Sequence, residues 1–354
     1  MNRTRILADW LRDKDENQLE KLRKYADAVR RENVGDAVHL RGLIEFSSYC
    51  VRQCTYCGLR AGNKYIPRYR MTREEILKCV DKAYELGYGT VVLQAGEDDE
   101  ISAGWLGEII QTIKINYPLA VTLSVGECSI DNYRLWRNQG ADRYLLKFET
   151  SDTNLFRRIH PPKGSQLPNR IELLKILQNL GYEIGGGIMV GLPGQTYSSV
   201  ARDIELFAEF DSDMIGIGPY IPHPNTPLGR EFAGMKKPIL DQIPNDDLAT
   251  NKVIALARIM CPEANIPATT ALASIHPCGF EEGLRYGANV IMPNLTPIKY
   301  RCLYEIYPNS VFQNTVDMHA QIMKIILASG RYPGSGRGDR RQHRYINSLL
   351  ASCG

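Results

Sequence analysis

The chain has 354 residues, of which 44% are hydrophobic and 23% are charged, and its formal net charge is only +3. This composition is ordinary for a globular protein, and the near balance of charge argues against a nucleic-acid partner. The N-terminal stretch is too charged for a signal peptide, and no apolar run approaches the roughly 20 residues of a membrane span. We therefore expect a cytoplasmic protein without a membrane partner.

The N-terminal stretch, from residue 4 to about residue 32, predicts two helices with mixed charge on their outer faces. We interpret residues 1–36 as a helical cap, residues 37–330 as the main domain and residues 331–354 as a C-terminal tail. The Gly/Arg-rich part of this tail, residues 334–344, fits a mobile terminus or a surface wrap. The apolar positions of the two helices are Leu7, Leu11, Leu19, Leu22 and Ala26.

After the cap, apolar β-rich runs alternate with helical stretches. Buried parallel strands produce near-continuous apolar runs, and repeated βα units predict a parallel sheet with right-handed crossovers. Eight units predict a closed (βα)8 TIM barrel, whose chemistry lies at the C-terminal ends of the strands; a doubly wound open sheet is the competing architecture. The predicted strands are 38–46, 90–96, 120–127, 142–150, 183–194, 213–221, 266–272 and 289–294, and the predicted helices are 72–87, 102–116, 130–139, 169–180, 197–210, 246–260 and 279–286.

The first strand runs into three closely spaced cysteines, Cys50, Cys54 and Cys57, in the pattern C-x3-C-x2-C. Three thiolates on one loop suit an iron–sulfur cluster and leave one of four irons without a protein ligand. A structural zinc site normally takes four ligands, often as two separated pairs, and no second CxxC occurs in the chain. Zinc is therefore the minor interpretation, and nine cysteines, an odd number, do not indicate a disulfide framework.

The cysteine loop resembles that of the radical S-adenosylmethionine (SAM) superfamily, whose members bind a [4Fe-4S] cluster through CxxxCxxC. The aromatic residue that precedes the last cysteine of that motif is Tyr56 here. The resemblance implies that Cys50, Cys54 and Cys57 are the metal ligands and the catalytic centre. It also implies that SAM chelates the open iron and is cleaved to a 5′-deoxyadenosyl radical.

Several strand-end residues fit the rest of a SAM site, although each has an ordinary structural explanation. Gly96 and Glu97 end the second strand, where the superfamily has a Gly-Gly-Glu segment, and alone they fit a turn with a helix-capping acid. Glu149 ends the fourth strand and Arg170 opens the following helix; singly, each suits a surface ion pair. The resemblance implies that these groups bind SAM through its amino, ribose and carboxylate groups, and that Met189, in the Gly-rich fifth strand, contacts adenine.

Further stretches resemble one family of this superfamily, HydE, the SAM-dependent maturase of [FeFe] hydrogenase. The resemblance implies that a small Fe(CO)2(CN)–cysteine complex arrives from the maturase HydG, is converted to a precursor of the di-iron H-cluster and passes towards the scaffold HydF. A radical mutase or synthase related to methylornithine or biotin synthase is one alternative, and a non-catalytic iron–sulfur or zinc scaffold is another. The matching stretches include RGLIEFSSYC (41–50), GLPGQT (191–196), IGIGPYIPHPNTPL (215–228) and GANVIMPN (287–294).

An anionic iron complex needs fixed cations and hydroxyl groups inside the barrel. Lys147 stands where the family usually has an arginine, which keeps the charge but loses the bidentate fork. The threonines among the candidates are explained equally well by β-propensity and packing. The six candidate substrate-binding residues are Thr122, Ser124, Arg143, Lys147, Thr269 and Thr270.

Some family members carry a second cluster near the C-terminus on three cysteines. Ser310, Met318 and Gln321 stand at those positions here, so we expect one [4Fe-4S] cluster only. The remaining cysteines fit buried small apolar residues. Participation of Cys128, Cys278 or His223 in the site stays open.

Overall fold

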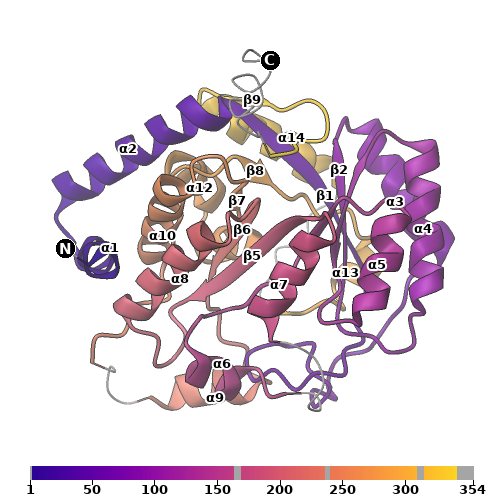
Figure 1. Cartoon of the computed structure of the whole chain (residues 1–354), viewed down its shortest axis with the longest axis horizontal. Helices are drawn as coiled ribbons and strands as arrows, with labels where there is room; N and C mark the ends of the chain where they lie inside the picture. Colours follow the sequence, from indigo (N-terminus) through magenta and orange to yellow (C-terminus); the bar gives the residue numbers. More distant parts are fainter. Residues whose placement is uncertain (1, 163–168, 236–239, 309–314, 341–354) are drawn as a thin grey trace, which may run out of the picture.

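The computed structural model describes residues 2–162, 169–235, 240–308 and 315–340. Eight parallel strands form its centre (Figure 1), in the order β6-β5-β4-β3-β2-β1-β8-β7. A parallel bridge between Met214 and Asn265 links the two outer edges of this order, so the sheet is a nearly closed barrel and the predicted TIM-barrel fold is confirmed. The strands are β1 (Ala37–Ser47), β2 (Thr90–Ala95), β3 (Ala120–Ser124), β4 (Arg143–Leu145), β5 (Glu183–Val190), β6 (Met214–Pro219), β7 (Pro267–Ala268) and β8 (Val290–Ile291).

Each predicted helix is present and covers the outside of the barrel. Side-chain caps fix where several of them begin: Thr72, Ser102 and Asn169 each accept a hydrogen bond from the backbone three residues on. Outward strand residues such as Val91 and Val121 are fully buried beneath the helices. These helices are α3 (Arg73–Glu85), α4 (Ala103–Asn116), α5 (Ile130–Asn138), α7 (Arg170–Asn179), α8 (Tyr197–Glu209), α10 (Asp247–Met260) and α12 (Gly279–Arg285).

The predicted strand 266–272 is wrong in its second half. Only Pro267 and Ala268 pair in the sheet, because Thr269 caps a helix, α11 (Thr270–Ile275), by accepting a hydrogen bond from the Leu272 amide. The structure also contains helices that were not predicted: α6 (Thr153–Ile159), α9 (Pro227–Gly234) and α13 (Ile298–Arg301), together with α14 (Thr315–Ala328). The first three are too short to show a clear apolar period.

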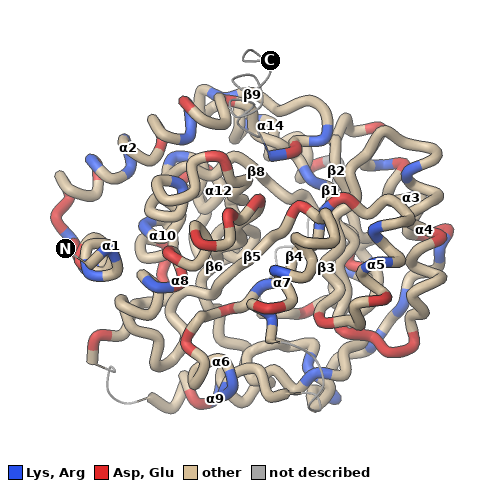
Figure 2. Tube along the Cα trace, in the orientation of Figure 1, with Lys and Arg blue, Asp and Glu red and all other residues tan. Residues whose placement is uncertain are grey.

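The two N-terminal helices, α1 (Arg3–Arg12) and α2 (Glu16–Val34), lie on the outer layer of helices. Helix α1 packs against α8 and α2 packs against α10 (Figure 1), with Leu7, Leu11 and Leu22 buried. Figure 2 shows basic and acidic positions intermingled along α2 and α3, in keeping with the small net charge. The domain boundaries at residues 36 and 330 remain predictions.

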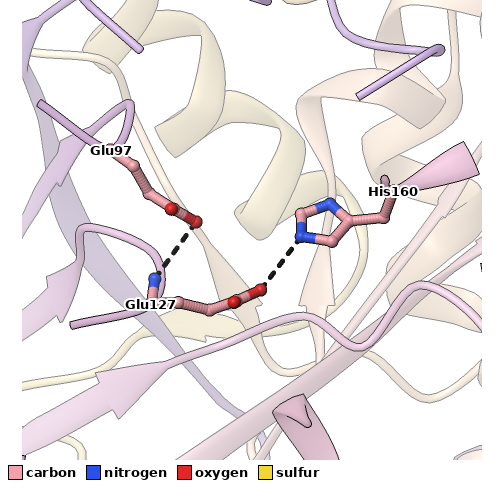
Figure 3. Close-up of side chains that lie close together, drawn as sticks. All are labelled: Glu97, Glu127 and His160. Atoms are coloured by element: carbon pink, nitrogen blue, oxygen red, sulfur yellow. Dashed lines mark hydrogen bonds and ion pairs between the residues drawn. The ribbon is translucent and has the colours of Figure 1, made fainter. Parts of the chain in front are cut away.

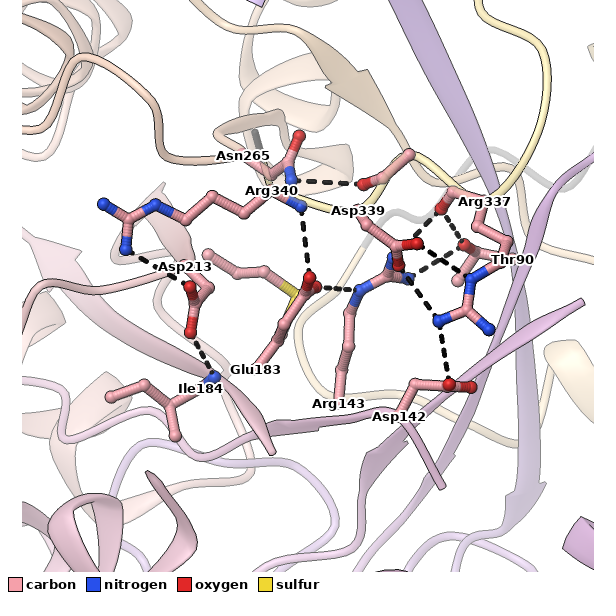
Figure 4. A network of polar contacts seen from close by, with 12 residues as sticks. Thr90, Asp142, Arg143, Glu183, Ile184, Asp213, Asn265, Arg337, Asp339 and Arg340 are labelled. Carbon is pink, nitrogen blue, oxygen red and sulfur yellow. Dashed lines mark hydrogen bonds and ion pairs between the residues drawn. The ribbon is translucent and has the colours of Figure 1, made fainter. Parts of the chain in front are cut away.

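The C-terminal segment closes the N-terminal end of the barrel. Strand β9 (Tyr332–Pro333) pairs with the start of β1, and residues 334–340 pass across the strand ends (Figure 4). The approach is so close that a Cβ on Gly89 would lie 1.6 Å from the carbonyl oxygen of Gly336. Residues 334–340 therefore wrap against the barrel, whereas residues 341–354 lie outside the described residues. None of the helices that the structure describes combines the length and the apolar composition required for a membrane crossing.

Candidate active site

The cysteine loop follows β1, at the C-terminal end of the barrel. Backbone hydrogen bonds hold it to three segments: Val51 N–H donates to the Glu97 carbonyl, Thr55 N–H to Ile159, and Gly58 N–H to Ile306. Cys54 is buried, and Cys50 and Cys57 are half-buried free thiols. Burial raises the pKa of Cys54 to about 12, so a bound metal would have to supply the free energy that keeps three thiolates here.

Gly96 ends β2 against this loop. A Cβ at residue 96 would lie 2.2 Å from the Tyr49 carbonyl oxygen and 2.6 Å from the Cys50 Cβ. The resemblance associates Gly96 with the SAM site, and the group that approaches it most closely in the structure is the chain's own cysteine loop. Glycine at this position therefore sets how closely β2 and the cysteines lie.

Buried charged side chains gather beside the cysteines, at the C-terminal ends of β2, β3 and β4 and the start of α7. Arg170 Nε donates to Glu127 Oε1 over 2.7 Å, and its Nη1 donates to the Lys147 carbonyl over 2.6 Å. The other ion pairs are longer: Arg170 lies 3.7 Å from Glu97 and 4.0 Å from Glu149. We call this set the charge cluster; its members are Arg52, Glu97, Glu127, Glu149 and Arg170, each with a side chain no more than 10% exposed.

Arg52 and Glu127 belong to the charge cluster although the sequence analysis did not single them out. Arg52 lies 3.5 Å from Glu127 and 3.7 Å from Glu97, and Glu97 Oε1 accepts a hydrogen bond from the Glu127 amide. A carboxylate at the last position of the predicted third strand, within the run VGE, was the signal available in the sequence. Acidic residues at strand ends are frequent, so the sequence alone does not show that Glu127 belongs to the site. Its role becomes visible only in the tertiary structure.

His160, which follows α6, joins the charge cluster to the cysteine loop. Its Nδ1 lies 3.0 Å from Cys54 Sγ, and its Nε2 lies 2.9 Å from Glu127 Oε1 (Figure 3). Burial lowers the pKa of His160 to about 4 although Glu127 opposes this. Burial itself opposes ionisation of Glu127, yet the hydrogen bond with His160 and the charge of Arg170 lower its pKa to about 2. At neutral pH the pair is therefore a neutral imidazole and a carboxylate.

Glu97, Glu127 and His160 also offer ligand atoms within 4.8 Å of one another, a spacing that could hold a metal ion. However, Arg52 contacts both acids, and Arg170 donates to Glu127. These guanidinium groups already neutralise the carboxylates. We therefore interpret the three residues as part of a charge network and not as a cation site.

Glu149 has the most unusual backbone of the charge cluster. It is a non-glycine residue with φ of 62°, a conformation that costs free energy and is concentrated at functional sites. Its Oε1 accepts a hydrogen bond from the Tyr56 hydroxyl over 3.3 Å, whereas the buried Oε2 has no partner among the described residues. Met189 donates its amide to the Glu149 carbonyl over 3.1 Å. Glu149 therefore offers a spare acceptor beside Tyr56 and Met189.

Lys147 crosses the inside of the barrel. A Cβ on Gly187 would lie 2.6 Å from Lys147 Cγ, and one on Gly216 would lie 3.2 Å from its Cε. The missing side chains of these two glycines on β5 and β6 make room for the lysine. On the same inner face, Ser124 is half-buried, and the buried Thr122 hydroxyl has no partner among the described residues.

Thr269 and Thr270 lie just beyond β7, where Thr269 caps α11 and Thr270, its first residue, is exposed. Arg143 lies elsewhere: it is fully buried at the opposite end of the barrel, where it donates to Glu183 over 2.5 Å and ion-pairs with Asp339 (Figure 4). The predicted substrate role of Arg143 is therefore wrong on geometry. The residue starts β4, and strand direction carries it to the closed end.

The residues whose participation was left open differ in their surroundings. His223 is buried, and a Cβ on Gly58 would lie 3.0 Å from its Nε2, so it packs on the cysteine loop. Cys128 is half-buried after β3, and Cys278 is exposed at the start of α12. Met318 and Gln321 lie on α14, whereas Ser310 and Cys353 lie outside the described residues.

Comparison with known proteins agrees with this arrangement. A model described as the radical SAM superfamily matches residues 44–207. The [FeFe] hydrogenase maturase subunit HydE of Thermotoga maritima is 45% identical over 95% of this chain and 93% of the relative. The 3-methylornithine synthase of Methanosarcina acetivorans is 31% identical over 78% of this chain and 75% of the relative. Among solved structures, methylornithine synthase (PylB) superposes with a TM-score of 0.77 at 25% identity over 94% of both chains.

A parallel barrel with three thiols on the loop after β1 and buried acids at the neighbouring strand ends defines a radical SAM enzyme. The solved structure of HydG, with a TM-score of 0.75 at 19% identity over 92% of this chain and 71% of that chain, supports the fold alone. Since the HydE relative is matched along almost its whole length, the chain belongs to the HydE family of radical SAM enzymes.

Proposed function

We propose that this enzyme acts in the maturation of [FeFe] hydrogenase, on a small Fe(CO)2(CN)–cysteine precursor of the di-iron H-cluster. The observation that carries the proposal is the juxtaposition of three free thiols with a buried acid–arginine cluster and an inward lysine at the open end of the barrel. The 45% identity to a HydE over 95% of the chain supports the same process.

The residues at this end fit a [4Fe-4S] cluster and SAM. Cys50, Cys54 and Cys57 would hold the cluster, which when bound would supply the electron for reductive cleavage of SAM. The spare Glu149 Oε2 suits a hydroxyl donor such as those of a ribose. Arg170 can exchange its long contacts with Glu97 and Glu149 for a ligand carboxylate.

The remaining site residues would recognise the amino and adenine ends of SAM. Glu97 can accept from an ammonium group, and Gly96 keeps it beside the cysteine loop. Tyr56 and Met189 pack in one small hydrophobic cluster with Tyr220. That apolar surface suits an aromatic base, while the Tyr56 hydroxyl holds Glu149 in place.

The substrate would lie deeper in the barrel, between β3, which carries Thr122 and Ser124, and Lys147, which follows β4. Thr269 and Thr270 would lie at the rim. The lysine supplies a fixed positive charge for an anionic iron complex or its cysteine carboxylate. The Thr122 hydroxyl, which has no hydrogen-bond partner within the described part of the chain, would supply a hydrogen bond. We infer from the family that HydG delivers this complex and that HydF receives the product. We also propose that the chain holds one [4Fe-4S] cluster only.

Two assays on the anaerobically reconstituted chain test the function. The reduced protein should cleave SAM, and it should activate apo-[FeFe] hydrogenase in a maturation assay with purified HydG and HydF. SAM cleavage without any activation would favour a mutase or synthase, to which the 31% identical methylornithine synthase points. Absence of SAM cleavage would favour a non-catalytic scaffold.

Lys147 tests the substrate role separately from the SAM chemistry. Lys147→Ala should keep SAM affinity and uncoupled SAM cleavage but lose most hydrogenase activation, because the barrel interior then lacks this cation. Lys147→Arg should retain activation, since guanidinium binds carboxylate with two hydrogen bonds. Near-normal activation by the alanine variant would remove the substrate role and leave the radical SAM assignment intact.

A further inference from the structure

We propose that His160 is a positioning residue for the cluster: its Nδ1–H donates a hydrogen bond to the iron-bound sulfur of Cys54 and thereby raises the cluster's reduction potential. This inference rests on the proposed cluster at Cys50, Cys54 and Cys57. It assigns a role to a residue that lies 106 positions from its partner in the chain.

The ring of His160 is held firmly beside the sulfur. The residue is 3% exposed, its amide donates to the Phe156 carbonyl over 2.8 Å, and its ring lies on that of Phe156 with centroids 4.9 Å apart. The preceding carbonyl, of Ile159, accepts a hydrogen bond from the Thr55 amide over 2.8 Å. Backbone and ring therefore both attach this segment next to Cys54, and Nδ1 lies 3.0 Å from Sγ.

The chemistry of the partners sets the direction of the hydrogen bond. A cysteine that ligates iron is a thiolate and carries no proton, so Nδ1 has to be the donor. On the other side of the ring, Nε2 lies 2.5 Å from Arg52 Nη2, and a guanidinium can only donate. A neutral imidazole with its proton on Nδ1 donates to the sulfur and accepts from Arg52. In that state Nε2 has no proton for Glu127 Oε1, which still accepts a hydrogen bond from Arg170 Nε over 2.7 Å. If Nε2 also gains a proton, Glu127 Oε1 can accept it, and Nδ1 still donates.

A hydrogen bond to a ligating sulfur changes the energetics of the cluster. It stabilises negative charge on the thiolate, and reduction adds negative charge, so the reduced state gains more than the oxidised state. The contact is buried, where hydrogen bonds are electrostatically stronger than in water. His160 should therefore make the cluster easier to reduce than an apolar residue at the same place would.

Three variants separate this role from simple packing. His160→Leu removes the donor. His160→Asn keeps an amide nitrogen close to the place of Nδ1, whereas His160→Gln places its nitrogen nearer to that of Nε2. The measurement is the midpoint potential of the reconstituted full-length protein, from a redox titration followed by electron paramagnetic resonance without SAM, with iron content determined for each sample. His319→Leu, which alters a histidine whose Nδ1 contacts the Tyr88 hydroxyl on the outer layer, is the control.

The expected result is a more negative midpoint potential for the Leu and Gln variants, and a potential near that of the unaltered protein for the Asn and His319 variants. An unchanged midpoint potential in His160→Leu at full iron content would overturn the role of His160 but leave the proposed function intact. If His160→Leu binds no iron, equal potentials of the Asn and Gln variants would overturn it. Loss of iron from all three would show a role in assembly and also overturn it. Absence of a cluster from the unaltered protein would instead refute the proposed function.

Discussion

The two ends of the barrel carry the same kinds of charged side chains but pair them differently. At the closed end, Arg143 and Arg337 make short ion pairs, for example 2.8 Å between Arg337 and Asp142 (Figure 4). At the open end, several contacts of the charge cluster span 3.5 to 4.0 Å, and Glu149 Oε2 has no partner among the described residues. Short, mutually satisfied pairs seal a structure, whereas long pairs can be exchanged for those of a ligand.

The two ends of the barrel also differ in backbone strain: glycines make the turns at the closed end, whereas a non-glycine residue is strained at the open end. The closed end uses the glycines of residues 334–338 to bring the C-terminal segment against His39 and Gly89. The open end holds Glu149 in a left-handed conformation, which costs of order 1–3 kcal/mol. We therefore expect substitutions at the closed end to change stability, and substitutions at the open end to change ligand binding.

The largest expected effect is at the cysteine loop. Cys54→Ser should lose the cluster and all SAM cleavage, because two thiolates cannot replace three, whereas Cys302→Ser, an exposed cysteine on the outside, should retain both. Iron analysis should give about four irons per chain for the unaltered protein, the content of one [4Fe-4S] cluster. A value near eight would contradict the single-cluster prediction, and cluster retention by Cys54→Ser would contradict the ligand assignment.

At the closed end, Glu183→Ala should lower the free energy of unfolding without changing SAM affinity. It leaves the fully buried Arg143 guanidinium with one acidic partner instead of two, and breaking such a pair costs roughly 3 kcal/mol. Urea unfolding is the measurement. Glu209→Ala, which removes an exposed ion pair with Arg202, is the matched control and should cost less than about 1 kcal/mol. Equal effects of the two variants would mean that the closed end is not a sealed structure.

Glu45, on the inner face of β1, should make the free energy of unfolding depend on pH. Burial raises its pKa to about 7, although Asn294 and the charge of Arg301 oppose the shift. The folded state therefore holds a proton that the unfolded state releases above about pH 4.5, and the free energy of unfolding should fall as the pH rises from 4.5 to 7. Over that window the loss is about 3 kcal/mol.

The test of this linkage is Glu45→Gln, which keeps an acceptor for Asn294 Nδ2 but cannot ionise. Its free energy of unfolding should depend less on pH between 4.5 and 7 than that of the unaltered chain. Glu108→Gln, on the exposed side of α4, should leave the slope unchanged. If Glu45→Gln and the unaltered chain show the same slope, another group controls this pH range; Asp203, whose pKa burial also raises to about 7, is the next one to replace.

The smallest effect is expected from Glu149→Gln at the open end. The variant keeps a side chain of the same size for the Tyr56 contact but removes the charge that suits ribose hydroxyl donors. A lost charge-assisted hydrogen bond costs roughly 1.5–3 kcal/mol, so SAM affinity should fall by about 10- to 100-fold while iron content stays unchanged. Calorimetric titration of SAM into the reconstituted protein measures this, with Glu108→Gln again as the control. Unchanged affinity would show that Glu149 has a structural role only.

Local sequence signals were sufficient for the barrel and for the core of the site. The apolar runs that became β1 to β6, the caps at Thr72, Ser102 and Asn169, and the spacing of the three cysteines all act over a few residues. Such signals report whether a segment is buried and how it begins, because both depend on neighbours in the chain. They also indicated that Glu97 and Glu149 lie at strand ends and that Arg170 opens a helix, and the structure brings these three together.

Only the closed barrel could decide which distant residues meet. Arg143 and Lys147 are four positions apart and looked alike in the sequence, yet the direction of β4 sends one to the sealed end and the other to the inner face above it. His160 and Cys54 are separated by 106 residues, and Arg143 and Asp339 by 196. Contacts of this range depend on strand order and register, which no local pattern encodes, and therefore Arg52, Glu127 and His160 became visible only in the tertiary structure. The tertiary structure also decided that residues 334–340, for which the sequence left a mobile terminus or a surface wrap open, pack against the barrel.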